Sequence, residues 1–427
     1  MPQECCRVVV LDPNYASSIG HHQPLNQALL EQLTSAGWQP EIWADEQAPS
    51  GPCVRRVSHG CGYIDPRHWV DLGGARHLAA QLNAQLQAAL EQDQSCGLAS
   101  PQAWLVHSVL PYQLIALAQV LQAQPAAQVV ISLMYGPRES LGGIEHWSQE
   151  RLASSCIETT RVALQALALA CRRAGHQLVV GCASVQQQTS YAPLLQRARL
   201  APPLLHPAVV GAGPQPAGEA NPQAQEMVLL HWGDNKPDKG LEEALNLLEA
   251  ILLCPAAERP QWPLLFHCHA SQGLSGEHSS LLDEAQRQLG QQLIVLSEQV
   301  SDRTMQQLLG QCSLALMAYN PITYAERSSG VFWCYAAARY GQGKAAHGVG
   351  YGNHWLQREA EALGMAWSSL PHLGYGHKPS GAQWLEAINA MRNGARECHT
   401  QWQPEAGQIL GQSFAQWAAR QLSRGGA

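Results

Sequence analysis

The stretch LLHWGDNKPDKGLEEA, residues 229–244, carries three consecutive signals of an α/β protein. An apolar run typical of a buried strand is followed by a polar loop with a lysine-glycine step, and then by a helix start. The amide groups and the positive dipole end of a helix N-terminus favour an anion. Lys239 and Gly240 therefore predict an anion-binding turn. The alternative interpretation is an ordinary helix start with solvated lysines.

The same strand-then-helix pattern recurs along the whole chain. Apolar runs predict strands over 7–13, 40–44, 103–109, 127–136, 177–183, 227–233, 263–270, 293–299 and 312–319. Helical spacing predicts helices over 24–36, 148–174, 241–253 and 408–422. Continuous apolar strands that alternate with helices indicate parallel sheets covered on both faces. The predicted fold class is α/β, with two tandem Rossmann-like, doubly wound domains facing a cleft.

The length and one compositional break predict where these domains divide. A chain of 427 residues is too long for one ordinary core. Residues 206–226 are rich in proline, glycine and alanine and have no periodicity, which is typical of a linker. We therefore expect domains over 1–205 and 227–405, with 406–427 forming a C-terminal helix that crosses back to the first domain.

Composition excludes several classes of protein. The net charge of −7 argues against a nucleic-acid-binding protein, which normally has a basic face. The 13 cysteines are odd in number and form no CxxC pair, which favours reduced thiols and a cytoplasmic location. We expect no signal peptide, and no transmembrane segment because no apolar run reaches the length that a span needs.

A second candidate turn lies in NPITYAERSSGVFWCYAAARYG, residues 320–341. It follows an apolar strand and precedes a helix, and it offers the guanidinium of Arg327, the hydroxyls of Ser328 and Ser329, and the backbone of Gly330. Together these groups predict an anion cradle at a strand-to-helix junction. The alternative is a serine that caps the helix next to a surface arginine.

A third candidate loop, DPNYASSIGHHQPLN at residues 12–26, follows the first predicted strand. Gly20 would let the backbone approach a ligand closely, and His21 could bind a polar substrate. His107, at the end of another predicted strand, is expected at the same edge of the sheet, although a lone histidine there can also be structural. No third and fourth ligand stands at metal spacing near His21 and His22, so we predict no metal site.

The order of these three segments resembles that of the GT-B glycosyltransferases, and in particular glycosyltransferase family 4 with its glycosyl transferases group 1 domain. A G-x5-K-G segment opens the second domain in that group, and Gly233, Lys239 and Gly240 match it. A later strand, serine-glycine loop and helix bind the diphosphate and the ribose, and residues 319–341 match them. The resemblance covers most of the chain.

The chain departs from this family pattern at several positions. Asp234 stands where the family has an arginine, and Lys236 is the candidate to supply that charge. When the segment is aligned on Gly330, Arg327 and Tyr335 occupy the positions of two family glutamates. Glu326 lies one position early for the first of them. The second glutamate normally receives the ribose hydroxyls, and a tyrosine there offers a single hydroxyl.

The resemblance implies a glycosyltransferase that moves a sugar from a nucleotide diphosphate to an acceptor hydroxyl, with retention and without a metal or another cofactor. It implies a carbohydrate or lipid-linked acceptor, no nucleic-acid partner, and possible peripheral membrane contact. The residues it implies for catalysis are Lys239, Arg327 and His107. Those implied for binding the donor are Gly20, His21, Gly233, Lys236, Gly240, Glu326, Ser328, Ser329, Gly330 and Tyr335. The alternatives are a non-catalytic GT-B module that binds a glycan or a partner, and a sugar-nucleotide epimerase.

Overall fold

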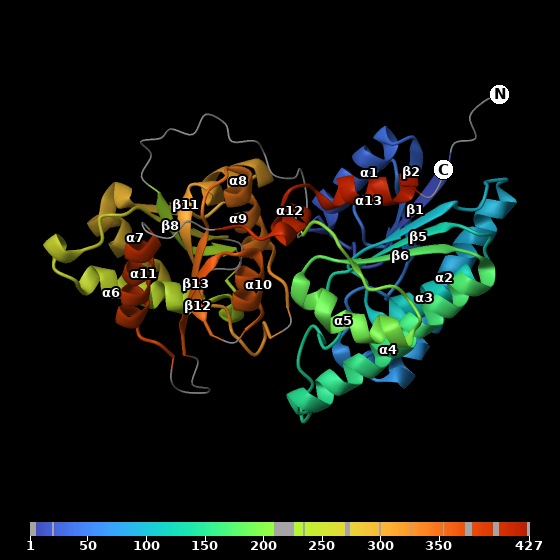
Figure 1. Ribbon diagram of the computed structural model, residues 1–427, viewed down its shortest axis with the longest axis horizontal. Coiled ribbons are helices and arrows are strands. Elements are labelled where there is room, and N and C mark those ends of the chain that lie inside the picture. Colours follow the sequence, from blue (N-terminus) through green and yellow to red (C-terminus); the bar gives the residue numbers. More distant parts are fainter. Residues whose placement is uncertain are drawn as a thin grey trace. The chain divides into compact units, whose positions relative to one another are not determined.

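The computed structural model describes residues 6–18, 21–208, 226–233, 235–269, 274–298, 300–325, 327–352, 354–371, 378–395 and 401–424. The chain divides into two compact units. Unit 1 comprises Met1–Gly211 together with Gln412–Ala427, and unit 2 comprises Ala212–Gly411. Each unit has a parallel sheet of its own, drawn with its helices in Figure 1.

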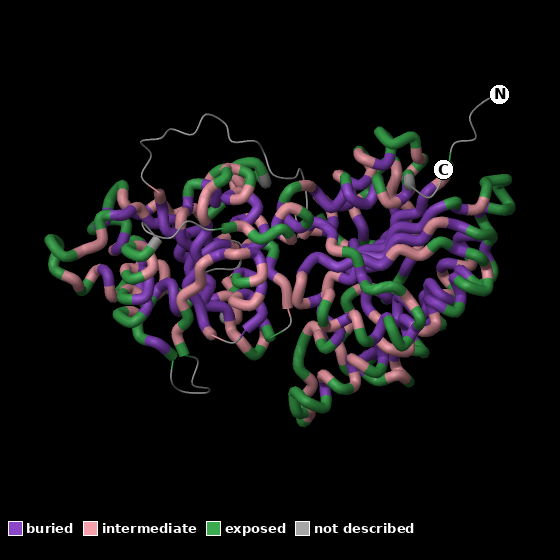
Figure 2. The backbone as a smooth tube through the Cα atoms, viewed as in Figure 1, coloured by how far each residue is buried: buried purple, intermediate pink, exposed green. Residues whose placement is uncertain are grey.

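The sheet of unit 1 has seven parallel strands in the order β3-β2-β1-β4-β5-β6-β7. Their bounds are β1 Cys6–Asp12, β2 Trp38–Asp45, β3 Val54–Ser58, β4 Ala103–Val106, β5 Gln128–Leu133, β6 Gln177–Cys182 and β7 Leu204–Leu205. Most of these strands are buried over much of their length, as the purple tubes in Figure 2 show. Burial on both faces explains why they read as unbroken apolar runs in the sequence.

Helices cover both faces of the unit 1 sheet (Figure 1). Val9 and Leu11 of β1 belong to the core under α2, α3 and α4, whereas Val8 and Val10 belong to the core under α1 and α13. The helix bounds are α1 His22–Ser35, α2 Leu72–Ser95, α3 Pro111–Leu121, α4 Gln149–Ala174, α5 Val185–Arg197 and α13 Phe414–Arg424. Alternate residues of one strand therefore face two different helix layers.

The long helix α4 shows how local sequence sets the bounds of an element. The hydroxyl of Ser148 accepts a hydrogen bond from the backbone amide of Arg151 at 3.2 Å, which caps the first turn. Gly175 ends the helix at a φ of 74°, a left-handed conformation that glycine adopts without steric cost. The predicted range of 148–174 agrees with this helix because both signals are visible in the sequence.

The sheet of unit 2 has six parallel strands in the order β10-β9-β8-β11-β12-β13. Their bounds are β8 Met227–Gly233, β9 Leu264–Cys268, β10 Leu293–Leu296, β11 Cys312–Met317, β12 His347–Tyr351 and β13 Ala366–Leu370. The helix bounds are α6 Leu241–Leu253, α7 Gly276–Leu289, α8 Asp302–Gly310, α9 Gly330–Gly341, α10 Trp355–Leu363, α11 Gly381–Ala395 and α12 Pro404–Leu410. Side chains of α6, α7 and α11 form one core with the sheet.

Both sheets reverse their strand order at one place. In each unit the first strand lies inside the sheet, with the second and third strands on one side and the fourth on the other. The reversal falls between β1 and β4 in unit 1 and between β8 and β11 in unit 2. Ligands of open parallel sheets bind beyond the carboxyl ends of the strands at such a reversal. The prediction of doubly wound parallel-sheet domains is confirmed.

The C-terminal region differs from its prediction. In place of one helix over 408–422, the chain forms α12 and α13, with 411–413 between them. Ser413 starts the second helix, because its hydroxyl accepts the amide hydrogen of Gln416 at 3.2 Å. Most of the predicted linker, 209–225, lies outside the described residues. Within the described parts of the chain, no helix has both the length and the apolar character that crossing a bilayer requires.

Candidate functional site

In unit 2, the two stretches that predicted anion binding follow β8 and β11, the two strands at the order reversal. A backbone hydrogen bond of 2.9 Å joins them, from the amide of Asn320 to the carbonyl of Asp238. Gly240 has a φ of 76°, and a Cβ atom at this position would lie 2.7 Å from the carbonyl oxygen of Ala318. Only glycine therefore fits the turn as it is built.

Lys239 ends a short 3-10 helix, Pro237–Lys239, immediately before Gly240. Its ammonium nitrogen lies 3.6 Å from the point that a Cβ atom on Gly233 would occupy. Gly233, the last residue of β8, has a φ of 124°. Lys236 lies exposed one turn earlier. The predicted G-x5-K-G segment therefore folds so that the charge of Lys239 lies over the carboxyl end of β8.

Arg327 lies beside the same turn. Its guanidinium is 5.7 Å from the ring centre of Tyr324, and one of its nitrogens is 3.8 Å from Oδ2 of Asp238. Both side chains of this ion pair remain partly exposed, at 24% and 26%. The carboxylate of Asp238 thus lies beside the guanidinium of Arg327, where the sequence predicted a positive charge alone. An anion that binds Arg327 has to compete with Asp238 for the guanidinium.

The serines after Arg327 have local partners. Ser329 caps α9, because its hydroxyl accepts the amide hydrogen of Phe332 at 3.3 Å, and it lies 3.3 Å from the hydroxyl of Tyr319. The indole of Trp333 donates to the hydroxyl of Ser328 at 2.7 Å. Gly330 is the first residue of α9, and a Cβ there would meet nothing within 4 Å. The capping interpretation of Ser329 is therefore correct, and it does not exclude a ligand at this helix start.

Tyr335 is placed differently from the expectation of a ribose-binding side chain. It is fully buried in α9, and burial raises its pKa. Its hydroxyl donates to the carbonyl of Ser313 at 2.9 Å and accepts from the amide of His347 at 3.1 Å. These bonds use the hydroxyl to join α9 to β11 and β12. Gly20 and Glu326, which the sequence also singled out, lie outside the described residues.

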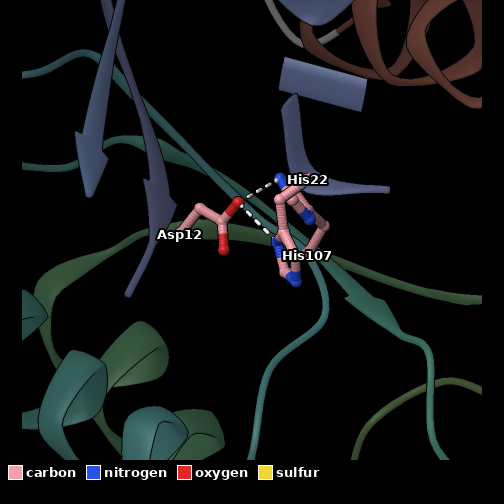
Figure 3. Close-up of side chains that lie close together, drawn as sticks. All are labelled: Asp12, His22 and His107. Atoms are coloured by element: carbon pink, nitrogen blue, oxygen red, sulfur yellow. Dashed lines mark hydrogen bonds and ion pairs between the residues drawn. The ribbon is translucent and has the colours of Figure 1, made fainter. Parts of the chain in front are cut away.

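In unit 1, a buried polar cluster occupies the reversal between β1 and β4 (Figure 3). Asp12 ends β1, His22 and Asn26 lie one turn apart on α1, and His107 follows β4 directly. All four residues are at most 6% exposed. Nδ1 of His22 lies 2.9 Å from Oδ2 of Asp12, and Nε2 of His107 lies 3.5 Å from the same oxygen. The sequence singled out the histidines but missed Asp12 and Asn26.

Hydrogen-bond chemistry sets the orientation of this cluster. The amide nitrogen of Asn26 donates to Oδ2 of Asp12 at 2.8 Å, because a carboxylate can only accept. The amide oxygen of Asn26 then accepts from Nε2 of a neutral His107 at 2.9 Å. Nδ1 of His107 is left to accept from the hydroxyl of Ser108 at 3.1 Å. Ser108 holds this position with a φ of 53°, which is uncommon outside glycine.

The protonation states follow from burial and charge. Burial lowers the pKa of His107 to about 4, against the attraction of Asp12. For Asp12, burial opposes ionisation, but His107 and the hydrogen bonds from His22 and Asn26 outweigh it and lower the pKa to about 2. At neutral pH the cluster therefore holds a buried carboxylate beside a neutral His107.

One side of the cluster reaches the surface. Nε2 of His22 lies 2.9 Å from the hydroxyl of Tyr63, which is 46% exposed and is itself hydrogen-bonded to the hydroxyl of Tyr135. His107, predicted to face an acceptor, is only 1% exposed. His21 contacts the cluster at its edge, with Nε2 at 3.3 Å from the hydroxyl of Ser108. Tyr63 thus connects the buried carboxylate to solvent through His22, and no sequence motif marked it.

Asp12, His22 and His107 also form a candidate metal site. One ligand atom from each lies within 4.8 Å of the other two. Only His22 of the adjacent pair His21 and His22 belongs to this set. The other histidine, His107, comes from a neighbouring strand of the sheet, which spacing along the chain does not reveal. The prediction that the protein uses no metal remains a prediction.

Comparison with known proteins gives the fold. No family model and no curated sequence matches the chain. Sucrose-phosphate synthase from Thermosynechococcus elongatus is a structural neighbour, with a TM-score of 0.56, 14% identity, and coverage of 98% of this chain and 97% of that chain. A trehalose-phosphate synthase from Burkholderia xenovorans, in complex with glucose-6-phosphate, has a TM-score of 0.50, 12% identity, and coverage of 98% and 99%.

The lipopolysaccharide outer core galactosyltransferase WaaB, in its apo form, is a further neighbour. Its TM-score is 0.50 at 10% identity, with 98% of both chains covered. These similarities extend over both units and show that the chain has the GT-B fold. The specific resemblance to family 4 is not established at this level of identity.

Proposed function

We propose that the protein is a nucleotide-sugar-dependent glycosyltransferase. The observation that carries this proposal is the turn at Lys239 and Gly240, which lies at the strand-order reversal of unit 2 and is tied to the loop that holds Arg327. This is the part of a doubly wound sheet where nucleotides bind. The GT-B fold of the chain is the fold on which the neighbouring transferases are built.

In the proposed reaction, the diphosphate of the donor lies over the turn. The bond between the anomeric carbon and the diphosphate oxygen breaks, and that oxygen keeps the electron pair. The acceptor oxygen forms the new bond and passes its proton to the departing diphosphate. Lys239 and Arg327 stabilise the negative charge that develops, so no metal is required at the diphosphate. The proposal includes retention of configuration at the anomeric carbon and a cytoplasmic nucleotide sugar as the donor.

Unit 1 would then supply the acceptor side, with a carbohydrate or a lipid-linked hydroxyl compound as the acceptor. Tyr63 and His21 are the residues through which the buried cluster could meet such a compound, because His107 and Asp12 are too deeply buried to do so. This differs from the expectation that His107 touches the acceptor directly. We therefore propose His107 as a positioning residue that orients Ser108.

The first experiment measures nucleotide binding by thermal shift with UDP, GDP, ADP and their common sugar derivatives. A ligand at 100 times its dissociation constant adds about 2.7 kcal/mol to the free energy of unfolding. We expect one nucleotide to raise the melting temperature in the wild type and in Lys344→Met, and to lose this effect in Lys239→Met. Lys344 is a matched control because it is a lysine of unit 2 whose ammonium nitrogen lies 3.9 Å from Oε1 of Glu226.

Transfer assays with the same variants test catalysis. Lys239→Met should lower turnover about 100-fold or more, by comparison with the loss of one oxyanion donor. Equal turnover in Lys239→Met and Lys344→Met would remove Lys239 from the mechanism.

The ion pair between Arg327 and Asp238 allows a second test in the opposite direction. Asp238→Asn removes the carboxylate that competes with the phosphates, and a partly exposed pair of this kind contributes about 0.2–1 kcal/mol. Nucleotide affinity should therefore rise, by at most about fivefold. Lower affinity in Asp238→Asn would mean that Arg327 does not bind the donor.

The second candidate function is a non-catalytic module that binds a glycan or a partner. The placement of Tyr335 favours it, because the residue aligned with the ribose-binding glutamate is buried and bonded to backbone. This candidate predicts no thermal shift with any nucleotide. Such a result, with a correctly folded protein, would replace the transferase proposal.

A further inference from the structure

The buried cluster of unit 1 has the donor set of a transition-metal site. Asp12, His22 and His107 supply one carboxylate and two imidazoles, which zinc and similar divalent ions prefer to all-oxygen sites. In Figure 3 the three side chains converge, and dashed lines join Asp12 to both histidines. We propose that this cluster binds a divalent transition-metal ion, with Zn²⁺ as the best match.

The distances between donors suit such an ion. Zinc bonds of about 2.0–2.2 Å in tetrahedral geometry place neighbouring donor atoms about 3.3 Å apart. Oδ2 of Asp12 lies 2.9 Å from Nδ1 of His22 and 3.5 Å from Nε2 of His107, on either side of that value. The donor atoms of all three residues lie within 4.8 Å of one another, so side-chain rotations have to bring the two histidine nitrogens together as well.

The second nitrogen of each histidine already has a partner. If His22 binds the ion through Nδ1, its Nε2–H donates to the hydroxyl of Tyr63 at 2.9 Å. If His107 binds through Nε2, its Nδ1–H donates to the hydroxyl of Ser108 at 3.1 Å. Histidines that bind metals nearly always donate their other N–H in this way, which fixes the ring orientation. Each histidine therefore already has the hydrogen-bond acceptor that a metal-bound imidazole needs.

The carboxylate supplies the independent observation. Asp12 is 0% exposed, and among the described residues its ion-pair partners are the two histidines alone. Its second oxygen, Oδ1, is buried and receives no hydrogen bond from any described residue. A cation bound at Oδ2 would neutralise this buried carboxylate and so lower the free-energy cost of burying its charge.

Binding would rearrange several hydrogen bonds. Coordination replaces the bond from Nδ1–H of His22 to Oδ2 of Asp12, and the bonds of His22 with Tyr63 and of His107 with Ser108 reverse direction. The ion takes the lone pair of Nε2 on His107, so the 2.9 Å contact of that nitrogen with Oδ1 of Asn26 is lost as a hydrogen bond. The amide oxygen of Asn26 then becomes available as a fourth donor. This site is separate from the diphosphate turn of unit 2, and it does not depend on the proposed transferase function.

The test measures metal content and affinity on the full chain. The protein is dialysed against a chelator, and Zn²⁺ binding is then followed by titration calorimetry and by elemental analysis after gel filtration. We expect one Zn²⁺ per chain in the wild type. Asp12→Asn should weaken binding at least about tenfold. His59→Gln is the matched control, because His59 pairs with Glu46 in unit 1 at an exposed position and should bind as the wild type does.

Tyr63→Phe tests the geometry without disturbing the core, because this side chain is partly exposed. Loss of the hydroxyl that orients His22 should weaken Zn²⁺ binding about 10- to 100-fold. The proposal is overturned if the wild type retains no Zn²⁺, or if Tyr63→Phe and His59→Gln bind it equally. Either result would make the cluster a hydrogen-bond network only. The wild-type and Tyr63→Phe measurements decide the question even if Asp12→Asn does not fold.

Discussion

Replacing Gly240 with alanine should destabilise unit 2 by about 2–5 kcal/mol. The first contribution is conformational, because a φ of 76° costs an L-residue about 1–2 kcal/mol. The second is steric, because the added Cβ would lie 2.7 Å from the carbonyl oxygen of Ala318 and 2.9 Å from its carbon. Backbone atoms on both sides must then move, which costs about 1–3 kcal/mol in a packed region.

Gly343→Ala separates these two contributions. Gly343 also lies in unit 2 and has a φ of 65°, but a Cβ there would meet nothing within 4 Å. The Gly343→Ala variant should therefore lose only the conformational part of the free energy of unfolding, about 1–2 kcal/mol. The assay is equilibrium urea denaturation followed by tryptophan fluorescence. Equal losses of unfolding free energy in the two variants would refute the steric contact between residue 240 and Ala318.

The same substitution should also affect binding. If Gly240→Ala moves the turn away from Ala318, the hydrogen bond between Asn320 and Asp238 is strained and Lys239 shifts. The folded fraction of Gly240→Ala should then bind nucleotide at least tenfold more weakly than that of Gly343→Ala. Unchanged affinity in a destabilised Gly240→Ala would separate the stability of this turn from ligand binding.

Three further predictions concern buried groups. Burial lowers the pKa of His206 to about 4, so the unfolded state binds a proton first as pH falls. Between pH 7 and pH 5, the loss of unfolding free energy should be about 2 kcal/mol smaller in His206→Gln than in the wild type. Gly181→Ala should cost about 1–3 kcal/mol and expose α13 to proteases, because the new Cβ would lie 2.9 Å from the ring of Trp417. Tyr335→Phe should lower the free energy of unfolding by about 1–3 kcal/mol without changing nucleotide affinity. A loss of affinity would mean that Tyr335 does bind the ribose.

The sequence was sufficient for elements whose signals are local. The long helix α4 has a serine cap, an apolar stripe and a terminal glycine within its own residues. The central strands are apolar on both faces. In contrast, the segments of α2 and α3 were expected only as helix-like and without bounds, although α2 begins with a cap from Asp71. The helix α3 is apolar on nearly all sides because it is buried between α2 and α4, so its sequence has little helical periodicity.

The site could be predicted only where residue type alone suggests chemistry. Lys239, Gly240 and Arg327 stood out because charge and glycine are informative at a strand-to-helix turn. Asp12 did not stand out, because it becomes a candidate only through its contact with His107. That histidine is distant in the sequence, and β4 brings it beside Asp12. The effect of Asp238 on Arg327 is likewise a contact between two loops, which neither loop reveals alone.

Unit 1 is built from two separate parts of the chain, and this affects the order in which the protein can fold during synthesis. Phe414 and Trp417 of α13 pack against His206, with ring centres 4.9 Å apart in both pairs, and α13 shares a core with α1. All of unit 2 is translated before α13 emerges from the ribosome. The unit that begins first is therefore completed last. Its α1 face stays uncovered while unit 2 is being made, which is when a chaperone would have an apolar surface to bind.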